Sequence, residues 1–158
     1  MTESLKALLA EWKETRYFTL EFINKLSDAD LDKKLPRKKL NTIRQHAYEV
    51  TLFQKDMIES LTTKICNFDE ADYAEYKPLP KQALVDRMAE LDDALEKALE
   101  QMDGTEMIDW FGEKRNIHHI FATMIGHEQM HLGQIIAFCY ATGIEIPKNV
   151  TEMMALEG

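Results

Sequence analysis

Residues 117–142 read IHHIFATMIGHEQMHLGQIIAFCYAT. Apolar residues recur in this stretch at intervals of three and four, which is the spacing of one face of an α-helix. Asn116 can cap the N-terminus of the helix, and Gly143 can end it. The inward-facing stripe is predicted to comprise Ile117, Ile120, Phe121, Met124, His127, His131, Ile135 and Phe138. Two histidines therefore occupy positions where a protein interior ordinarily holds leucine.

Three further segments show the same periodicity and complete the fold prediction. They extend from about Ser4 to Leu26, from Asn41 or Thr42 to about Ile65, and from about residue 80 to residue 103, where Gly104 follows. No stretch shows the alternation that is typical of a strand. At 158 residues the chain is the size of one ordinary domain. The sequence thus predicts an all-α four-helix bundle that forms a single domain over residues 1–158.

The charge of the chain limits its partners. A formal net charge of −9 argues against a nucleic-acid-binding face, because the phosphate backbone would be repelled. One basic cluster is the exception, and it is either a solvated loop or a rim that attracts anionic substrates. The cluster comprises Lys33, Lys34, Arg37, Lys38 and Lys39.

The remaining composition bears on location and assembly. The first residues, MTESLKALLAEWKE, are not a signal peptide, and no apolar run reaches the roughly 18 residues of a membrane span. Cys66 and Cys139 do not form a disulfide scaffold, so we expect a cytoplasmic protein. Met153 and Met154 on an exposed helix face make a homodimer a further expectation.

The histidines carry the functional prediction. His127 and His131 are four residues apart, so their rings lie about 40° and roughly 6 Å apart on one helical face. His46 holds the same kind of inward position in the second helix. Buried imidazoles need partners for their ring nitrogens, and the apolar stripes around them supply few. We therefore predict a metal site between the second and fourth helices, with His46, His127 and His131 as ligands.

Three nitrogen ligands with open positions are typical of a catalytic metal site. The expected cofactor is one divalent ion, with zinc first and then nickel, iron, manganese or another transition metal. Glu49 lies one turn beyond His46, and Glu128 directly follows His127, so either is a candidate general base. Gln134 lies about one turn beyond His131 and is a candidate to orient this ring or a bound ligand.

Two known kinds of metal protein use histidine and glutamate motifs of this type, and this sequence fits neither of them well. A metalloprotease of the metzincin class needs glycine and histidine where this chain has Gln134 and Ala137, and no edge strand is predicted to hold a peptide. A di-iron bundle needs a second Glu-x-x-His pair in addition to Glu128 and His131, together with inward glutamates. The sequence has no such second pair, and the inner stripe of the third helix is apolar.

Three segments resemble the DinB/YfiT-like family of metal-binding four-helix bundles. They are IRQHAYEV around His46, IDWFGEKRN before the fourth helix, and GHEQMHLGQI around His127 and His131. The resemblance spans nearly the whole chain and implies that these three histidines bind the metal, with water at the remaining positions. It further implies a link to reactions in which a low-molecular-weight thiol is added to an electrophile.

Three functions follow as hypotheses. The first is a metal-dependent thiol S-transferase, in which coordination lowers the pKa of a bound thiol and a small-molecule electrophile is attacked. The second is a metal-activated hydrolase, in which Glu49 or Glu128 deprotonates a bound water. The third is a bundle that binds metal or a small ligand without catalysis. Each hypothesis requires the histidines to meet around one cation.

Overall fold

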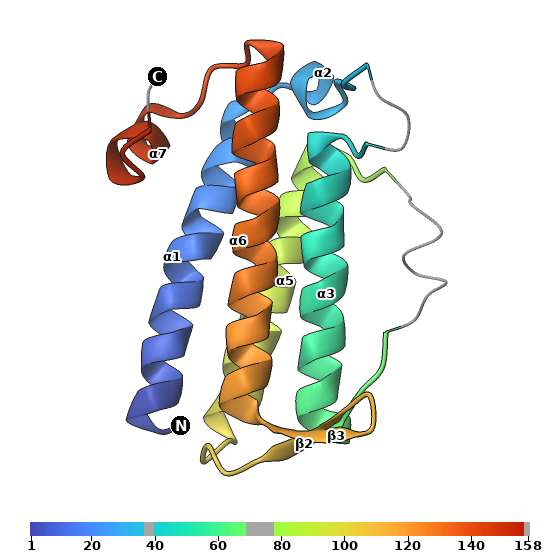
Figure 1. Ribbon diagram of the computed structural model, residues 1–158, viewed down its shortest axis with the longest axis vertical. Helices are drawn as coiled ribbons and strands as arrows, with labels where there is room; N and C mark the ends of the chain where they lie inside the picture. Colours follow the sequence, from blue (N-terminus) through green and yellow to red (C-terminus); the bar gives the residue numbers. More distant parts are fainter. Residues whose placement is uncertain (37–39, 69–77, 157–158) are drawn as a thin grey trace.

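The computed structural model describes residues 1–36, 40–68 and 78–156 of the chain. Within these residues, four long helices run side by side along the long axis of the molecule (Figure 1). Helix α6 packs against α1 and α3, and α5 packs against the same two helices. Each long helix therefore buries a face against two others. These helices are α1 (Glu3–Lys25), α3 (Ile43–Thr63), α5 (Lys81–Glu100) and α6 (Ile117–Thr142).

The helix ends follow local chemistry and confirm the predicted caps. Thr42 caps α3 in a capping box, in which Gln45 donates its backbone N–H to the threonine hydroxyl and accepts the backbone N–H of Thr42. The Asn116 side chain accepts the backbone N–H of His118 at the start of α6. Gly143 ends α6 with φ of +68°, a left-handed conformation that glycine adopts at no steric cost. These two helices, α3 and α6, carry the candidate ligands.

The prediction that the chain contains no strand was wrong. A small sheet has the order β1-β2-β3, with β1 (Ile65–Cys66) parallel to β2 (Met107–Trp110) and β2 antiparallel to β3 (Glu113–Asn116). Phe111 and Gly112 form the two-residue turn between β2 and β3, and both have positive φ, as the twist of a tight hairpin requires. These strands are too short to show a periodic pattern, and β1 pairs with a segment distant in sequence.

Two short helices were also absent from the prediction. They are α2 (Asp28–Leu31), which follows α1, and α7 (Lys148–Met153), which follows α6. Their apolar side chains pack into one buried hydrophobic cluster. In this cluster Leu31 and Val150 lie with Phe22 and Phe138. In Figure 1, α2 lies at the end of the bundle where α6 ends, and α7 lies beside the upper part of α1.

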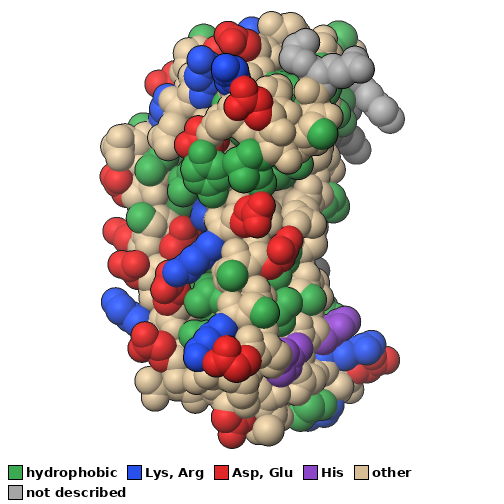
Figure 2. Space-filling model, turned by 90° about the vertical axis from the view of Figure 1, so that its left-hand side faces the viewer, with side chains coloured by type: hydrophobic (Ala, Val, Ile, Leu, Met, Phe, Trp, Pro, Cys, Tyr) green, Lys and Arg blue, Asp and Glu red, His purple; other side chains and the backbone are tan. Residues whose placement is uncertain are grey.

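The charges on the surface and the apolar character of the helices can be compared with the sequence. On the face shown in Figure 2, basic and acidic side chains are interspersed, and hydrophobic side chains gather in its upper half. Among the described residues, no helix combines the length and the apolar character that crossing a membrane requires. Three members of the basic cluster, Arg37, Lys38 and Lys39, lie outside the described residues, whereas Lys33 forms an ion pair with Asp30.

Candidate metal centre

His131 lies at the centre of the candidate site. Its Nδ1 atom is 3.0 Å from Nδ1 of His46 on α3, and its Nε2 atom is 3.3 Å from Nε2 of His127, one turn earlier on α6. His131 is 4% exposed, and the other two rings are half-buried. The fold therefore brings together all three histidines that the sequence predicts as ligands, with His131 between the other two.

Glu49 joins this group from α3. Its Oε2 atom is 3.8 Å from Nε2 of His131, and one ligand atom from each of His46, Glu49 and His131 lies within 4.8 Å of the other two. Asn41, just before α3, donates its amide N–H to Oε1 of Glu49 at 2.6 Å and holds the carboxylate in place. Sequence reasoning assigned Glu49 as a base and missed its place as a potential ligand. The signal was the His-x-x-Glu spacing, which puts both side chains on one helical face.

Burial sets the protonation state of the rings. It lowers the pKa of His131 to about 3, with a further lowering by the charges of the two neighbouring histidines, and a Gln134 hydrogen bond opposes the shift. Burial also lowers the pKa of His127 to about 4 and depresses that of His46. The imidazoles are therefore neutral near pH 7, and a neutral imidazole is the form that binds a metal.

The ring of His127 is fixed by an aromatic neighbour. Phe53 on α3 stacks face to face on this ring, with centroids 3.8 Å apart and planes at 9°. Phe68 in turn stacks on Phe53 at 5.3 Å. This stacking packs the His127 ring without using a ring nitrogen, and its Nε2 atom faces Nε2 of His131.

The donor types around His131 suit a divalent cation. Metal–nitrogen bonds of about 2.0–2.1 Å in a tetrahedral site place neighbouring ligand atoms roughly 3.3–3.4 Å apart. His131 faces His46 through Nδ1 at 3.0 Å and His127 through Nε2 at 3.3 Å, so the two separations lie on opposite sides of its ring and do not describe one coordination sphere. The ligand atoms that converge within 4.8 Å are those of His46, Glu49 and His131. Three neutral nitrogen donors and one carboxylate are also the donor types that zinc and neighbouring transition metals accept. The residues present therefore fit a metal site.

The structure does not bring Glu128 to the histidines. Its side chain is 2% exposed and lies on another side of α6, where Oε1 is 3.2 Å from Nη1 of Arg16 on α1. Arg16 also pairs with Asp92 at 3.3 Å and donates to Gln54 at 2.5 Å. Burial raises the pKa of Glu128, and the Arg16 charge opposes this shift. Glu128 thus belongs to a polar network that joins α1, α3, α5 and α6.

The other predicted residues divide between the site and the rest of the molecule. Gln134 adjoins the site, because it hydrogen-bonds the His131 side chain and lines a cavity that reaches His46. His118 hydrogen-bonds Ser4 and Asn116 near the start of α6, at the other end of the helix. Both cysteines are buried and free, and burial raises the pKa of each thiol to about 11. Neither thiol is poised as a nucleophile.

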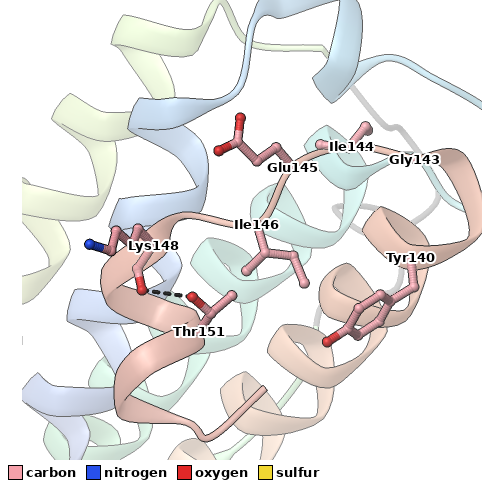
Figure 3. Close-up of a pocket in the computed structure, with 7 residues that line it drawn as sticks. All are labelled: Tyr140, Gly143, Ile144, Glu145, Ile146, Lys148 and Thr151. Carbon is pink, nitrogen blue, oxygen red and sulfur yellow. Dashed lines mark hydrogen bonds between the residues drawn. The ribbon is translucent and has the colours of Figure 1, made fainter. Parts of the chain in front are cut away.

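A larger hollow lies elsewhere, between the end of α6 and α7 (Figure 3). Its volume is about 470 Å³, and it contains none of the candidate ligands among its lining residues. The Thr151 hydroxyl is already donated to the Lys148 carbonyl at 2.7 Å. The lining residues are Tyr140, Gly143, Ile144, Glu145, Ile146, Lys148 and Thr151. The volume of a hollow therefore does not identify the functional site. The convergence of the three imidazoles does.

Comparison with known proteins agrees with this architecture. The chain is similar to a DinB-like protein from Bacillus cereus ATCC 10987, whose crystal structure superposes with a TM-score of 0.72 at 20% identity, covering 90% of this chain and 95% of that one. No curated protein matches the chain. The family model of the DinB superfamily matches residues 11–135, a range that includes all three histidines and Glu49. The chain therefore belongs to the DinB superfamily.

Proposed function

We propose that this protein is a four-helix bundle that holds one divalent metal ion between α3 and α6 and uses it in catalysis. His46, His127 and His131 are the proposed ligands, and Glu49 is placed either to complete the coordination or to act on a bound ligand. The observation that carries the proposal is the convergence of His46, Glu49 and His131 within 4.8 Å from two helices. Zinc is the first candidate ion, followed by nickel or another transition metal.

Glu49 is the proposed proton acceptor. A divalent ion in this site would lower the pKa of a bound thiol or water and so supply a nucleophile near neutral pH. Burial raises the pKa of Glu49, with the Asn41 hydrogen bond opposing, which brings this carboxylate closer to the range where a general base is effective. Its Oε2 atom lies 3.8 Å from His131 Nε2, so a ligand bound beside that ring is within its reach.

The reaction that we favour is transfer of a low-molecular-weight thiol to a small electrophile. With an epoxide as the electrophile, the thiol S–H bond breaks, its proton passes to Glu49 and the sulfur forms a bond to one ring carbon. The C–O bond at that carbon opens, and its oxygen takes the proton back from Glu49 to give the alcohol. The resemblance to the DinB/YfiT-like family is what suggests this reaction, and the three histidines and their flanking segments lie inside the range that the family model matches. The alternative is hydrolysis, in which the same carboxylate takes the proton of a bound water.

A comparison of rates with and without thiol tests the proposal. Zinc-loaded protein is given a small epoxide with cysteine or glutathione, and separately a p-nitrophenyl ester without thiol. We expect thiol-dependent consumption of the epoxide and a loss of about 10²–10⁴-fold in turnover for Glu49→Gln. Glu59→Gln is the matched control, since Glu59 lies on the same helix and is exposed. Ester hydrolysis without thiol would select the hydrolase instead.

A role in metal or ligand binding without catalysis makes the opposite prediction. Substitution of Glu49 and Gln134 would then leave the biological output of the protein intact as long as metal is bound.

The predicted homodimer and the cytoplasmic location also remain predictions. Met153 and Met154 are exposed at the end of α7, as that expectation requires, and sedimentation equilibrium at several protein concentrations tests for self-association.

A further inference from the structure

Three hydrogen-bonded side chains join the start of α1 to the start of α6, at the end of the bundle where both helices begin (Figure 1). The Ser4 hydroxyl oxygen lies 2.7 Å from Nε2 of His118, and Nδ1 of His118 lies 2.5 Å from Oδ1 of Asn116. His118 precedes His127 in α6 by about 14 Å along the helix axis. This triad is therefore separate from the candidate metal centre.

The partners of Asn116 determine the direction of these hydrogen bonds. Its Nδ2 atom donates to the backbone carbonyl of Gly104 at 3.0 Å, so Oδ1 is the atom that faces His118. Because an amide oxygen only accepts, Nδ1 of His118 carries the ring proton. In a neutral imidazole the other nitrogen, Nε2, then has the free lone pair and accepts the O–H of Ser4. His118 is thus placed as a base on the serine hydroxyl.

Gly104 permits the close packing that holds this geometry. It has φ of +89°, and a Cβ atom there would lie 3.1 Å from Cε1 of His118 and 3.2 Å from Oγ1 of Thr2. Thr2 Oγ1 is 3.1 Å from Ser4 Oγ, and since the Ser4 proton is directed to His118, the Thr2 hydroxyl is the donor of that pair. The imidazole and the serine hydroxyl are therefore each held by a further contact.

The serine oxygen is open to a substrate. Ser4 is exposed, and His118 is partly exposed. Ser4 also lies in the first turn of α1, where backbone N–H groups have no partner within the helix and can stabilise the negative oxygen that forms when a carbonyl is attacked. A serine with a base at hydrogen-bonding distance, and a third group that orients this base, is typical of acyl-transfer sites, and asparagine serves as the third group in some of them.

We propose that Ser4, His118 and Asn116 form a second reactive site, which takes acyl groups from small esters without a metal. As Ser4 Oγ bonds to the ester carbonyl carbon, His118 Nε2 takes the hydroxyl proton. The bond from that carbon to the alcohol oxygen then breaks, and the alcohol leaves with the proton from His118. Water repeats these two steps on the acyl-serine, which releases a carboxylic acid and restores the Ser4 hydroxyl. Asn116 is a positioning residue that keeps the ring proton on Nδ1.

The tautomer of His118 tests the direction of the hydrogen bonds. Proton–nitrogen correlation NMR spectra of the metal-free protein at about pH 8, where an ordinary imidazole is neutral, distinguish the two forms. We expect the Nδ1–H form. Asn116→Ser keeps a good helix cap but has no amide oxygen to face the ring, so it should shift His118 toward the Nε2–H form. An Nε2–H ring in the wild-type protein would mean that His118 donates to Ser4, and the proposal would be overturned.

Acylation of metal-free, untagged protein by p-nitrophenyl acetate tests the reaction. We expect nitrophenol release and, in samples quenched in acid, an acetyl group that tandem mass spectra locate on Ser4. Ser4→Ala should abolish both. Ser27→Ala is the matched control and should keep both, because Ser27 is also an exposed serine at a helix N-terminus but donates its hydroxyl to Asp30.

The base is tested by His118→Gln. Glutamine retains hydrogen-bonding groups for Ser4 and Asn116 but accepts no proton, so acylation should slow by about 10²–10⁴-fold while the urea midpoint changes little. A merely structural tie between α1 and α6 would not produce this split. Acetylation of Ser4 no faster than that of Ser27, an unchanged rate in His118→Gln, or full nitrophenol release in Ser4→Ala would overturn the proposal.

Zinc separates this site from the proposed function, because p-nitrophenyl esters report on both. Hydrolysis that needs zinc and is lost in Glu49→Gln belongs to the metal centre. Nitrophenol release that persists in EDTA and in His131→Leu, and is lost in Ser4→Ala, belongs to the serine. A protein that lacks one of these activities refutes only the corresponding proposal.

Discussion

Glu128 directly follows His127 in α6, yet the two side chains contact different helices. His127 stacks on Phe53 of α3, whereas Glu128 pairs with Arg16 of α1. Successive residues of a helix are about 100° apart around its axis, so neighbours cannot share a face. The HExxH segment here thus divides between two environments, with its histidines at the candidate metal centre and its glutamate in the polar network with Arg16.

The first prediction concerns this glutamate and metal binding. Glu128→Gln should change zinc affinity by less than about threefold, because the carboxylate is directed to Arg16 and away from the imidazoles. Isothermal titration of metal-free protein measures the affinity. Since Gln retains the size of the side chain, a large loss of zinc binding in this variant would show that the carboxylate acts on the metal after all.

The second prediction concerns the Arg16 network and stability. Arg16→Met should lower the free energy of unfolding by about 3–5 kcal/mol, because it leaves the buried Glu128 carboxylate without its counter-charge. Urea unfolding followed by circular dichroism measures the change. Lys13→Met is the control, since Lys13 on α1 pairs with Glu96 on α5 at the surface, and this change should cost about 1 kcal/mol or less. Equal losses would contradict a special role for the buried pair.

The third prediction concerns the ligands. Zinc at about 100 times its dissociation constant should stabilise the wild-type protein by roughly 2.7 kcal/mol and raise its melting temperature. His131→Leu should abolish this increase, because His131 connects His46 and His127. His119→Leu, at the far end of α6, should keep it. Scanning calorimetry with and without EDTA gives both values, and a zinc-induced shift retained in His131→Leu would exclude this site.

The fourth prediction concerns pH in the absence of metal. Burial lowers the pKa of His127 to about 4 and of His131 to about 3, below the ordinary histidine value of 6.5. In the window between these values the unfolded chain binds protons that the folded protein does not, so stability is full above pH 6.5 and falls as the pH drops toward 4 and 3. Urea midpoints between pH 7.5 and 4 measure this effect.

The matched sample for that experiment is the double variant His127→Leu, His131→Leu. It removes both depressed imidazoles, so its stability should depend less on pH across the same window, while the carboxylates that titrate at lower pH are unchanged. Parallel curves for the two proteins would show that these rings are not the groups responsible. With zinc present, protons compete for the imidazoles only as the pH approaches these lowered pKa values, so the wild-type protein should keep the ion at pH 6 and release it toward about pH 4.

Sequence by itself determined the features that depend on near neighbours. The caps at Thr42 and Asn116, the end of α6 at Gly143, and the four-residue spacing of His127 and His131 are set within one or two helical turns. Their physical causes are hydrogen bonds to the first free N–H groups, the left-handed conformation of glycine and the 3.6-residue period. The same local spacing placed His46 and Glu49 on one face.

Tertiary structure alone decided which of two plausible glutamates faces the histidines. Glu49 and Glu128 each lie beside a candidate ligand in sequence, and the choice between them depends on how α3 and α6 are rotated against each other and against α1. That rotation is set by the packing of whole helix faces, so no local pattern encodes it. For the same reason the sequence could not predict the Phe53–His127 stack or the pairing of β1 with β2. In both contacts the partners are far apart along the chain.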